Sequence, residues 1–178
     1  MNRLDDAGRP ARRPAHFLAL MTMAMMAIAV TQSPARAGDT GRLRGAAQVI
    51  DATRLVIRGR TIILAGIIAP SLQSPCLWKG RRRMNCGRMA RAALMDLTAG
   101  ATVTCGRDAA LGGWRCRVGG YDLGEGMIHA GWALPAPSAP PAWRAQGEEA
   151  RRDRRMLWQA RALNGKSFME ILLTRRRQ

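Results

Sequence analysis

The sequence predicts an α+β fold in which five short strands form a small closed β-barrel of the OB type and about three helices pack on it. Short runs of β-branched residues alternate with tight turns before residue 70 and again between residues 101 and 118. Apolar residues at helical spacing follow both groups of strands. Of the 178 residues, 47% are hydrophobic and 23% are charged, which suits one globular domain and excludes collagen-like, coiled-coil and fully disordered chains.

Three strands joined by tight turns are expected to open the domain. They cover residues 41–51, 55–57 and 61–68. Arg58-Gly59-Arg60 is the expected turn between the second and third strands, and Pro70 ends the third. We expect a long loop, which holds Cys76 and Cys86, to connect these strands to the first helix.

In the second half of the chain, the sequence predicts one helix before a further pair of strands and two helices after it. In residues 87–99 apolar residues recur at helical spacing, and Gly100 supplies a stop. Asp122 is expected to cap a short helix that runs to Ala130. The remaining segments are strands over 101–106 and 114–118, an extended linker over 135–141, a last helix over 143–162 and a basic tail over 163–178 without a clear packing pattern.

Residues 1–37 have the pattern of a cleaved secretory signal peptide. A positively charged start precedes an uncharged apolar run over 17–30, and Ala35-Arg36-Ala37 is a small-x-small cleavage site. The apolar run is shorter than the roughly 20 residues that a membrane-spanning helix needs. We therefore expect an exported protein, in a periplasm or outside the cell, whose folded domain covers 38–162. Such a compartment permits disulfides.

The chain is strongly basic. It has 29 Lys and Arg against 12 Asp and Glu, a net charge of +17, of which +14 remains without residues 1–37. A charge this large favours polyanionic partners. The alternative explanation for this charge is a genome base composition that favours arginine codons.

Several short motifs follow one another in a specific order. GAAQVID (45–51) leads into a turn, and LAGIIAP (64–70) ends a strand at a proline. Gly131-Trp132-Ala133 follows the short helix, and the last helix contains residues 148–158. Together, over about residues 44–160, these motifs resemble the staphylococcal nuclease-like (thermonuclease) family. The resemblance implies an OB-type barrel and Ca²⁺-assisted hydrolysis of phosphodiester bonds in DNA or RNA.

The catalytic residues that the resemblance implies are missing. The family needs two aspartates that bind Ca²⁺, a glutamate that positions water and two arginines that hold the phosphate. This chain has Thr53 and Ile68 for the two aspartates, Ser71 for the glutamate, and Ile63 and Gly113 for the two arginines. We therefore predict that the calcium site is not retained, that no metal or other cofactor is bound, and that the fold is kept without its chemistry.

A relocated catalytic site is the alternative. In it, phosphate would bind Arg54, Arg58 or Arg60, and the metal would bind Asp51 or Asp108. One carboxylate beside a threonine hydroxyl would make a poor calcium site. His129, the only histidine after residue 37, is expected to pack or to cap a helix rather than to act as a base.

The four cysteines allow three pairings. Cys105 and Cys116 lie on strands that we expect to be adjacent, which leaves Cys76 to pair with Cys86. Exported members of the resembled family that carry cysteines at these places look similar. A four-cysteine zinc site is the alternative, but none of the spacings is C-x₂-C.

The loop between Cys76 and Cys86 is the predicted binding segment. It groups Trp78, Lys79, Arg81, Arg82 and Arg83. Cations that follow phosphates beside an aromatic stacking face are typical of single-strand binding, whereas the alternative is a solvated basic loop. Residues 151, 152, 154 and 155, all arginines, either extend this patch or keep the protein soluble. The sequence thus predicts a non-catalytic module for nucleic acid or another polyanion, with a relocated nuclease site or a structural cell-envelope role as alternatives.

Overall fold

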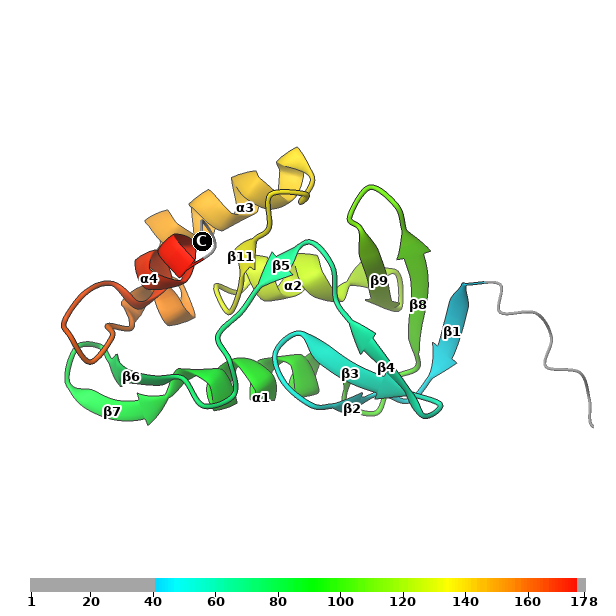
Figure 1. Cartoon of the computed structure of the whole chain (residues 1–178), viewed down its shortest axis with the longest axis horizontal. Coiled ribbons are helices and arrows are strands. Elements are labelled where there is room, and N and C mark those ends of the chain that lie inside the picture. Colours follow the sequence, from blue (N-terminus) through cyan, green and yellow to red (C-terminus); the bar gives the residue numbers. More distant parts are fainter. Residues whose placement is uncertain (1–40, 176–178) are drawn as a thin grey trace, which may run out of the picture. The chain divides into compact units, whose positions relative to one another are not determined.

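The computed structural model describes residues 41–175, and in this part of the chain it has four α-helices, one 3-10 helix and short antiparallel strands (Figure 1). The predicted α+β class is therefore confirmed, with one helix more than expected. The predicted signal peptide lies outside the described residues. Within residues 41–175, no helix has the length and apolar character needed to cross a membrane.

The first predicted strand is divided in two, because the chain changes its pairing partner halfway along it. Its first half, β1, pairs with the much later strand β8, whereas its second half, β2, pairs with β3. β3 also pairs with β4, so β2, β3 and β4 form one antiparallel sheet. The third predicted strand is likewise divided, into β4 and β5. These strands are β1 (Arg42–Gly45), β2 (Gln48–Val49), β3 (Arg54–Ile57), β4 (Arg60–Ile63) and β5 (Ile67–Ile68).

The segment predicted as a long loop contains a β-hairpin. Its strands are β6 (Pro75–Trp78) and β7 (Arg82–Asn85). Lys79 and Gly80 have φ of +49° and +73°, and a type I′ turn needs positive φ at both of its central residues. A disulfide joins Cys76 to Cys86, as predicted, and so ties the base of the hairpin to the first turn of helix α1 (Cys86–Thr98).

The second sheet has the strand order β1-β8-β9-β10. Its later strands are β8 (Val103–Asp108), β9 (Gly113–Val118) and β10 (Tyr121–Asp122). Cys105 and Cys116 lie directly opposite each other on β8 and β9 and form the second predicted disulfide. Asp122 caps helix α2 (Leu123–His129), as predicted, because its carboxylate accepts hydrogen bonds from two backbone amides of the first turn.

The C-terminal part differs from the prediction in two ways. The last helix expected over 143–162 is divided, because Arg154 takes a φ of +52°, which an α-helix does not allow. The tail expected to lack packing instead contains a helix that buries Phe168 and Met169. The elements are β11 (Leu134–Pro135), which pairs with β5, then α3 (Pro141–Arg152), the 3-10 helix η1 (Met156–Gln159) and α4 (Phe168–Arg175).

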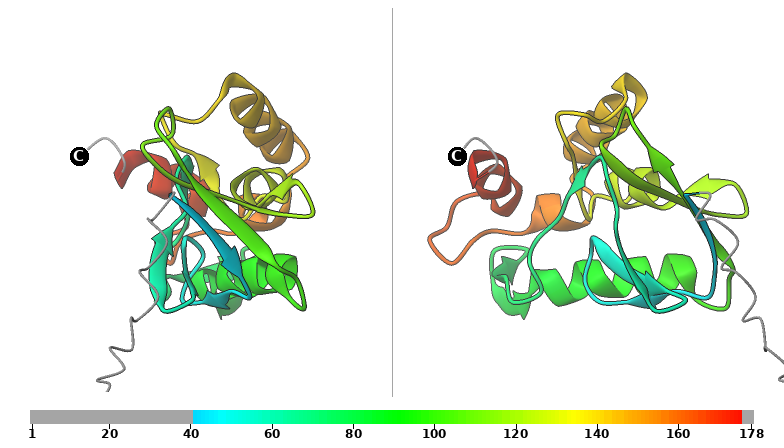
Figure 2. Two further views of the ribbon diagram at one scale, coloured as in Figure 1. Left: turned by 90° about the vertical axis from the view of Figure 1, so that its right-hand side faces the viewer. Right: turned by 45° about the vertical axis from the view of Figure 1, so that its right-hand side comes forward.

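The core lies between the two main sheets and the helices. Fully buried side chains come from both sheets and from α1 and α2, among them Leu55, Ile62, Leu94, Val103 and Met127. Helix α2 lies between α1 and α3 (Figures 1 and 2). None of the sheets in the described part closes on itself, so the structure confirms an α+β fold of separate antiparallel sheets and not the finer prediction of a barrel.

Candidate functional site

Three of the five positions that carry catalytic residues in the resembled family lie around one backbone bridge. Leu64 and Trp114 form this bridge, which is parallel. Thr53 accepts a hydrogen bond from the Leu64 amide at 2.8 Å. Ile63 and Gly113 immediately precede the two bridging residues on β4 and β9. The structure therefore brings positions 53, 63 and 113 together, but none of them presents a charged group.

The side chains at these positions cannot replace the missing arginines. Ile63 is 58% exposed, so it lies on the surface and does not fill a buried pocket. A Cβ at Gly113 would lie 2.9 Å from the Cβ of Ala65, which is closer than two carbon atoms normally approach. A long side chain at position 113 would thus require β4, β9 or the connection after β4 to move.

The other two positions lie further along the chain. Ile68 is on β5, opposite Leu134, and packs against the core. Ser71 is exposed in the loop that follows, where its hydroxyl lies 2.9 Å from the hydroxyl of Ser74. Neither group can bind a calcium ion in the way that a carboxylate does.

Asp51, the carboxylate that survives in the turn between β2 and β3, is fully engaged within that turn. Its Oδ1 accepts hydrogen bonds from the amides of Thr53 and Arg54 at 2.8 and 2.7 Å, and from the Thr53 hydroxyl at 3.0 Å. Its Oδ2 accepts one from the Arg54 Nε at 2.6 Å. Burial raises the pKa of Asp51, but these hydrogen bonds outweigh burial and hold the pKa below its ordinary value.

Most of the groups proposed for a relocated site are engaged in other contacts. Arg60 lies over the ring of Trp114, 5.8 Å from its centroid. Arg54 bonds to Asp51, and the Asp108 carboxylate accepts a hydrogen bond from the Leu111 amide at 3.0 Å. Across residues 41–175, no three His, Cys, Asp or Glu side chains are grouped so that they could hold a metal ion. His129 is exposed at the end of α2, so it is not the packed residue that the sequence allowed. Arg155 donates a hydrogen bond to its carbonyl at 3.0 Å and lies 3.3 Å from its Nδ1, so the residue that caps this helix end is Arg155.

The predicted binding segment is the hairpin of β6 and β7. Its four cations, Lys79, Arg81, Arg82 and Arg83, are all exposed. Trp78 is half-buried and stacks on Trp132 with a centroid separation of 6.5 Å and an interplanar angle of 14°. One face of the Trp78 ring is therefore occupied by protein. The hairpin is also anchored at its outer edge, where Leu77 exchanges two backbone hydrogen bonds with Arg161, at 2.7 and 2.9 Å.

A cavity of about 520 Å³ lies beside the tip of this hairpin. It is lined by Lys79, Gly80, Asp153, Arg154, Gln159 and Arg161. The Asp153 carboxylate is paired with Arg155 at 2.6 Å, so the three cations of the lining face a largely neutralised acid. Lys79 and Arg154 are two of the four non-glycine residues with positive φ in the described chain. Strained backbone of this kind is concentrated at functional sites.

The four arginines of residues 151–155 have different roles. Arg154 lines the cavity beside the hairpin, and Arg152 is exposed. Arg155 instead binds Glu149 at 2.9 Å in addition to Asp153, and Arg151 lies over the ring of Trp158. The sequence did not indicate Gln159 and Arg161 as site residues, because nothing near them in the chain marks the fold that brings them to the hairpin.

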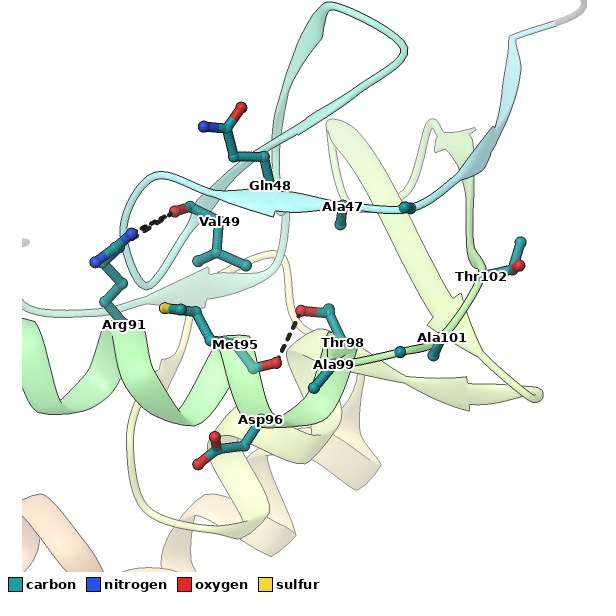
Figure 3. Close-up of a pocket in the computed structure, with 12 residues that line it drawn as sticks. Ala47, Gln48, Val49, Arg91, Met95, Asp96, Thr98, Ala99, Ala101 and Thr102 are labelled. Atoms are coloured by element: carbon teal, nitrogen blue, oxygen red, sulfur yellow. Dashed lines mark hydrogen bonds between the residues drawn. The ribbon is translucent and has the colours of Figure 1, made fainter.

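A further cavity, of about 670 Å³, lies between β2 and the C-terminal end of α1 (Figure 3). Small and apolar residues line most of it. Arg91 bonds to the Val49 carbonyl through Nε and Nη2, at 3.2 and 3.1 Å, and Asp96 points away from the other lining residues (Figure 3). No set of polar groups converges here, so this cavity is not the candidate site.

Comparison with other proteins identifies no family for this chain. No protein-family model matches this chain, and no curated protein matches it. The likeness to the staphylococcal nuclease-like family therefore stays a prediction from the ordered motifs.

Proposed function

We propose that this chain is an exported, non-catalytic module that binds nucleic acid or another polyanion on an OB-type barrel of the staphylococcal nuclease-like family. The observation that carries the proposal is the hairpin of β6 and β7. It presents four exposed cations beside a cavity lined by two further arginines, Arg154 and Arg161. The disulfide at its base and the backbone bonds to Arg161 hold this cationic surface in place.

The path of the strands supports a barrel of this type. Residues 42–49 join the two main sheets along one side, because β1 belongs to one sheet and β2 to the other. On the opposite side, the bridge of Leu64 and Trp114 and the hydrogen bond from the Ala65 amide to the Trp114 carbonyl, at 2.9 Å, connect the end of β4 to β9. These two connections between the sheets are compatible with an OB-type barrel and support this part of the proposal.

The chemistry of the positions around the bridge supports a role without catalysis. Phosphodiester hydrolysis of the family's kind needs a metal held by carboxylates and fixed cations on the phosphate. Thr53, Ile63 and Gly113 supply neither, and Asp51 is engaged by its own turn. The two disulfides are compatible with export to an oxidising compartment.

Binding of a fluorescein-labelled oligothymidine of about 20 nucleotides, followed by anisotropy over a range of salt concentrations, tests the proposal. We expect the affinity to fall steeply with salt, because each neutralised phosphate releases about 0.7 counterion on a single strand. Replacing Arg81, Arg82 and Arg83 by alanine is expected to lower the slope of log affinity against log salt by about two.

The matched control removes three cations elsewhere. Arg88, Arg152 and Lys166 are exposed and lie outside the cavity beside the hairpin, so their replacement by alanine changes the net charge equally. This control should leave most of the slope intact. Absence of binding at low salt, or equal slopes for both triple variants, would contradict the proposed hairpin site.

A further inference from the structure

The outer face of the sheet β1-β8-β9 carries two rows of arginines. Directly opposite residues of antiparallel strands share a face. The register therefore places Arg42, Gly106 and Arg115 in one row across the three strands. It places Arg44, Thr104 and Arg117 in the next row. In both rows a small residue of β8 separates an arginine of β1 from an arginine of β9.

A groove of about 270 Å³ lies between the arginines of β1 and those of β9. Its floor is formed by Thr104 and Gly106, and its charged walls by Arg42 on one side and by Arg115 and Arg117 on the other. Gly119 and Gly120, in the turn after β9, leave one end of the groove without side chains. Neighbouring strands lie about 4.8 Å apart, so the two walls stand roughly 10 Å apart across β8. This width leaves room between the arginines for a phosphate group.

A buried carboxylate orients the arginines of β9. Asp122 is only 4% exposed, and its Oδ2 accepts a hydrogen bond from Arg115 Nε at 2.6 Å and lies 3.8 Å from Arg117 Nε. This hydrogen bond raises the pKa of Arg115. Arg115 is also positioned over the ring of Trp143, 5.5 Å from its centroid. Because the bond uses Nε, both Nη atoms of Arg115 are without a hydrogen bond in the described part of the chain.

The groove keeps a net positive charge. Asp108 lies at one end, where its carboxylate is 3.7 Å from Arg115 Nη1 and accepts a hydrogen bond from the Leu111 amide. Asp122 pairs with the arginines of β9 and also caps α2. Arg42 and Arg44 have no ion-pair partner among residues 41–175, and Arg107 lies over the ring of Trp114. The two rows thus carry four arginines, and two acids lie near them.

We propose that this groove is a second binding site, which takes backbone phosphates of a single-stranded nucleic acid. The proposal rests on the proposed nucleic-acid function but uses a different surface. Guanidinium groups bind phosphate through paired hydrogen bonds, which suits walls made of arginine alone. No aromatic ring lines the groove, so it binds the backbone without stacking a base and without reading sequence.

Paired variants test the groove. In Arg42→Gln/Arg117→Gln both substituted residues line the groove, whereas Arg88→Gln/Lys166→Gln removes the same charge from other exposed positions. With the labelled oligothymidine, we expect the groove variant to lower the salt slope by about 1.4, which is two contacts at about 0.7 each, and the control to leave it unchanged. Equal slopes for the two pairs would overturn the proposal, as would equally tight binding of a polyglutamate of similar length.

Backbone amide spectra of the ¹⁵N-labelled protein, titrated with the same oligonucleotide, separate this site from the hairpin. We expect the amides of Thr104, Gly106 and Arg117 to shift as the oligonucleotide is added. Shifts confined to residues 77–83 would overturn the groove and leave the hairpin site standing. Shifts confined to the groove would instead overturn the hairpin site, and no shifts at either place would overturn both.

Discussion

At the scale of the residue, the turn between β2 and β3 shows how a carboxylate can serve structure instead of chemistry. Asp51 accepts four hydrogen bonds from Thr53 and Arg54. A calcium ion would have to compete with all of them for the same two oxygens. The carboxylate fixes the turn that leads the chain from β2 into β3, and it thereby sets the register of that pair.

The lowered pKa of Asp51 predicts a dependence of stability on pH. A carboxyl whose pKa is lower in the folded than in the unfolded state stabilises the fold above its unfolded pKa, about 3.9, and this contribution is lost as the pH falls through the folded pKa. We expect Asp51→Asn to cost about 1–2 kcal/mol of unfolding free energy at pH 7. Denaturant titrations should show that this difference shrinks as the pH is lowered towards about 3.

The matched control for this measurement is Asp96→Asn. Asp96 is exposed on α1, and its carboxylate makes no hydrogen bond or ion pair with the other residues of 41–175. The substitution Asp96→Asn should therefore change the unfolding free energy little at any pH. A constant difference between wild type and Asp51→Asn across the pH range would show that the Asp51 carboxylate does not stabilise the turn through its charge.

Gly113 gives a second prediction at this scale. An added Cβ would meet the Cβ of Ala65 at 2.9 Å, so Gly113→Ala is expected to cost about 1–3 kcal/mol through overpacking. Gly106→Ala is the control, because Gly106 also lies within a strand of the same sheet but its Cβ would meet only a flexible arginine side chain, at 3.9 Å. Thermal unfolding of both variants measures the difference, and equal midpoints would contradict the close approach of β9 to residue 65.

At the scale of the element, the sequence predicted the structures that depend on neighbouring residues. The cap at Asp122 and the helix after Cys86 both arise from contacts within a few positions. The division of the first strand could not be predicted, because it depends on which distant strand each half meets. The hairpin was missed because its turn needs a positive φ at Lys79, where the sequence has none of the usual turn residues for that position.

The candidate site likewise combines features that the sequence predicts with features that only the fold shows. The cations of the hairpin could be predicted from composition alone, since four of them lie within five residues. The cavity beside its tip could not, because Arg154 and Arg161 reach it through the turn after α3 and the backbone bonds between Leu77 and Arg161. The sequence also did not indicate the arginine rows of the sheet, because they depend on the register of β1 with β8, a strand far later in the chain.

The disulfide at the base of the hairpin gives a prediction for this element. Cys76 and Cys86 are fully buried and close a short ring, so Cys76→Ala/Cys86→Ala is expected to cost about 2–3 kcal/mol of unfolding free energy. Because the hairpin positions the four cations, the double variant should also lower the salt slope of oligonucleotide binding. Removing the other bridge, with Cys105→Ala/Cys116→Ala, should reduce stability similarly. Both variants are measured at the same interval below their own unfolding midpoints, and this second variant should keep the part of the slope that Arg81, Arg82 and Arg83 contribute. Loss of slope in both variants would show that the effect comes from the fold as a whole.

At the scale of the whole molecule, the described chain carries its exposed cations on several distinct surfaces. The hairpin and the cavity at its tip form one, and the outer face of β1-β8-β9 forms another. Each surface also holds acids: Asp153 lines the cavity at the hairpin tip, and Asp108 and Asp122 pair with the arginines of β9. Cations still outnumber acids in the lining of both surfaces, and the proposed binding of a polyanion depends on this excess.

The last prediction concerns catalysis by the whole protein. The purified chain is expected not to degrade DNA or RNA in excess Ca²⁺, while a known calcium-dependent nuclease does so under the same conditions. Positions 53, 68 and 71 offer no carboxylate, positions 63 and 113 offer no guanidinium, and Asp51 is bound within its own turn. Restoring one residue, as in Ile68→Asp, should not produce activity, because catalytic groups that act as a unit are far from additive. Cleavage that needs Ca²⁺ and disappears in Asp51→Ala would show instead that the turn after β2 still holds a working metal site.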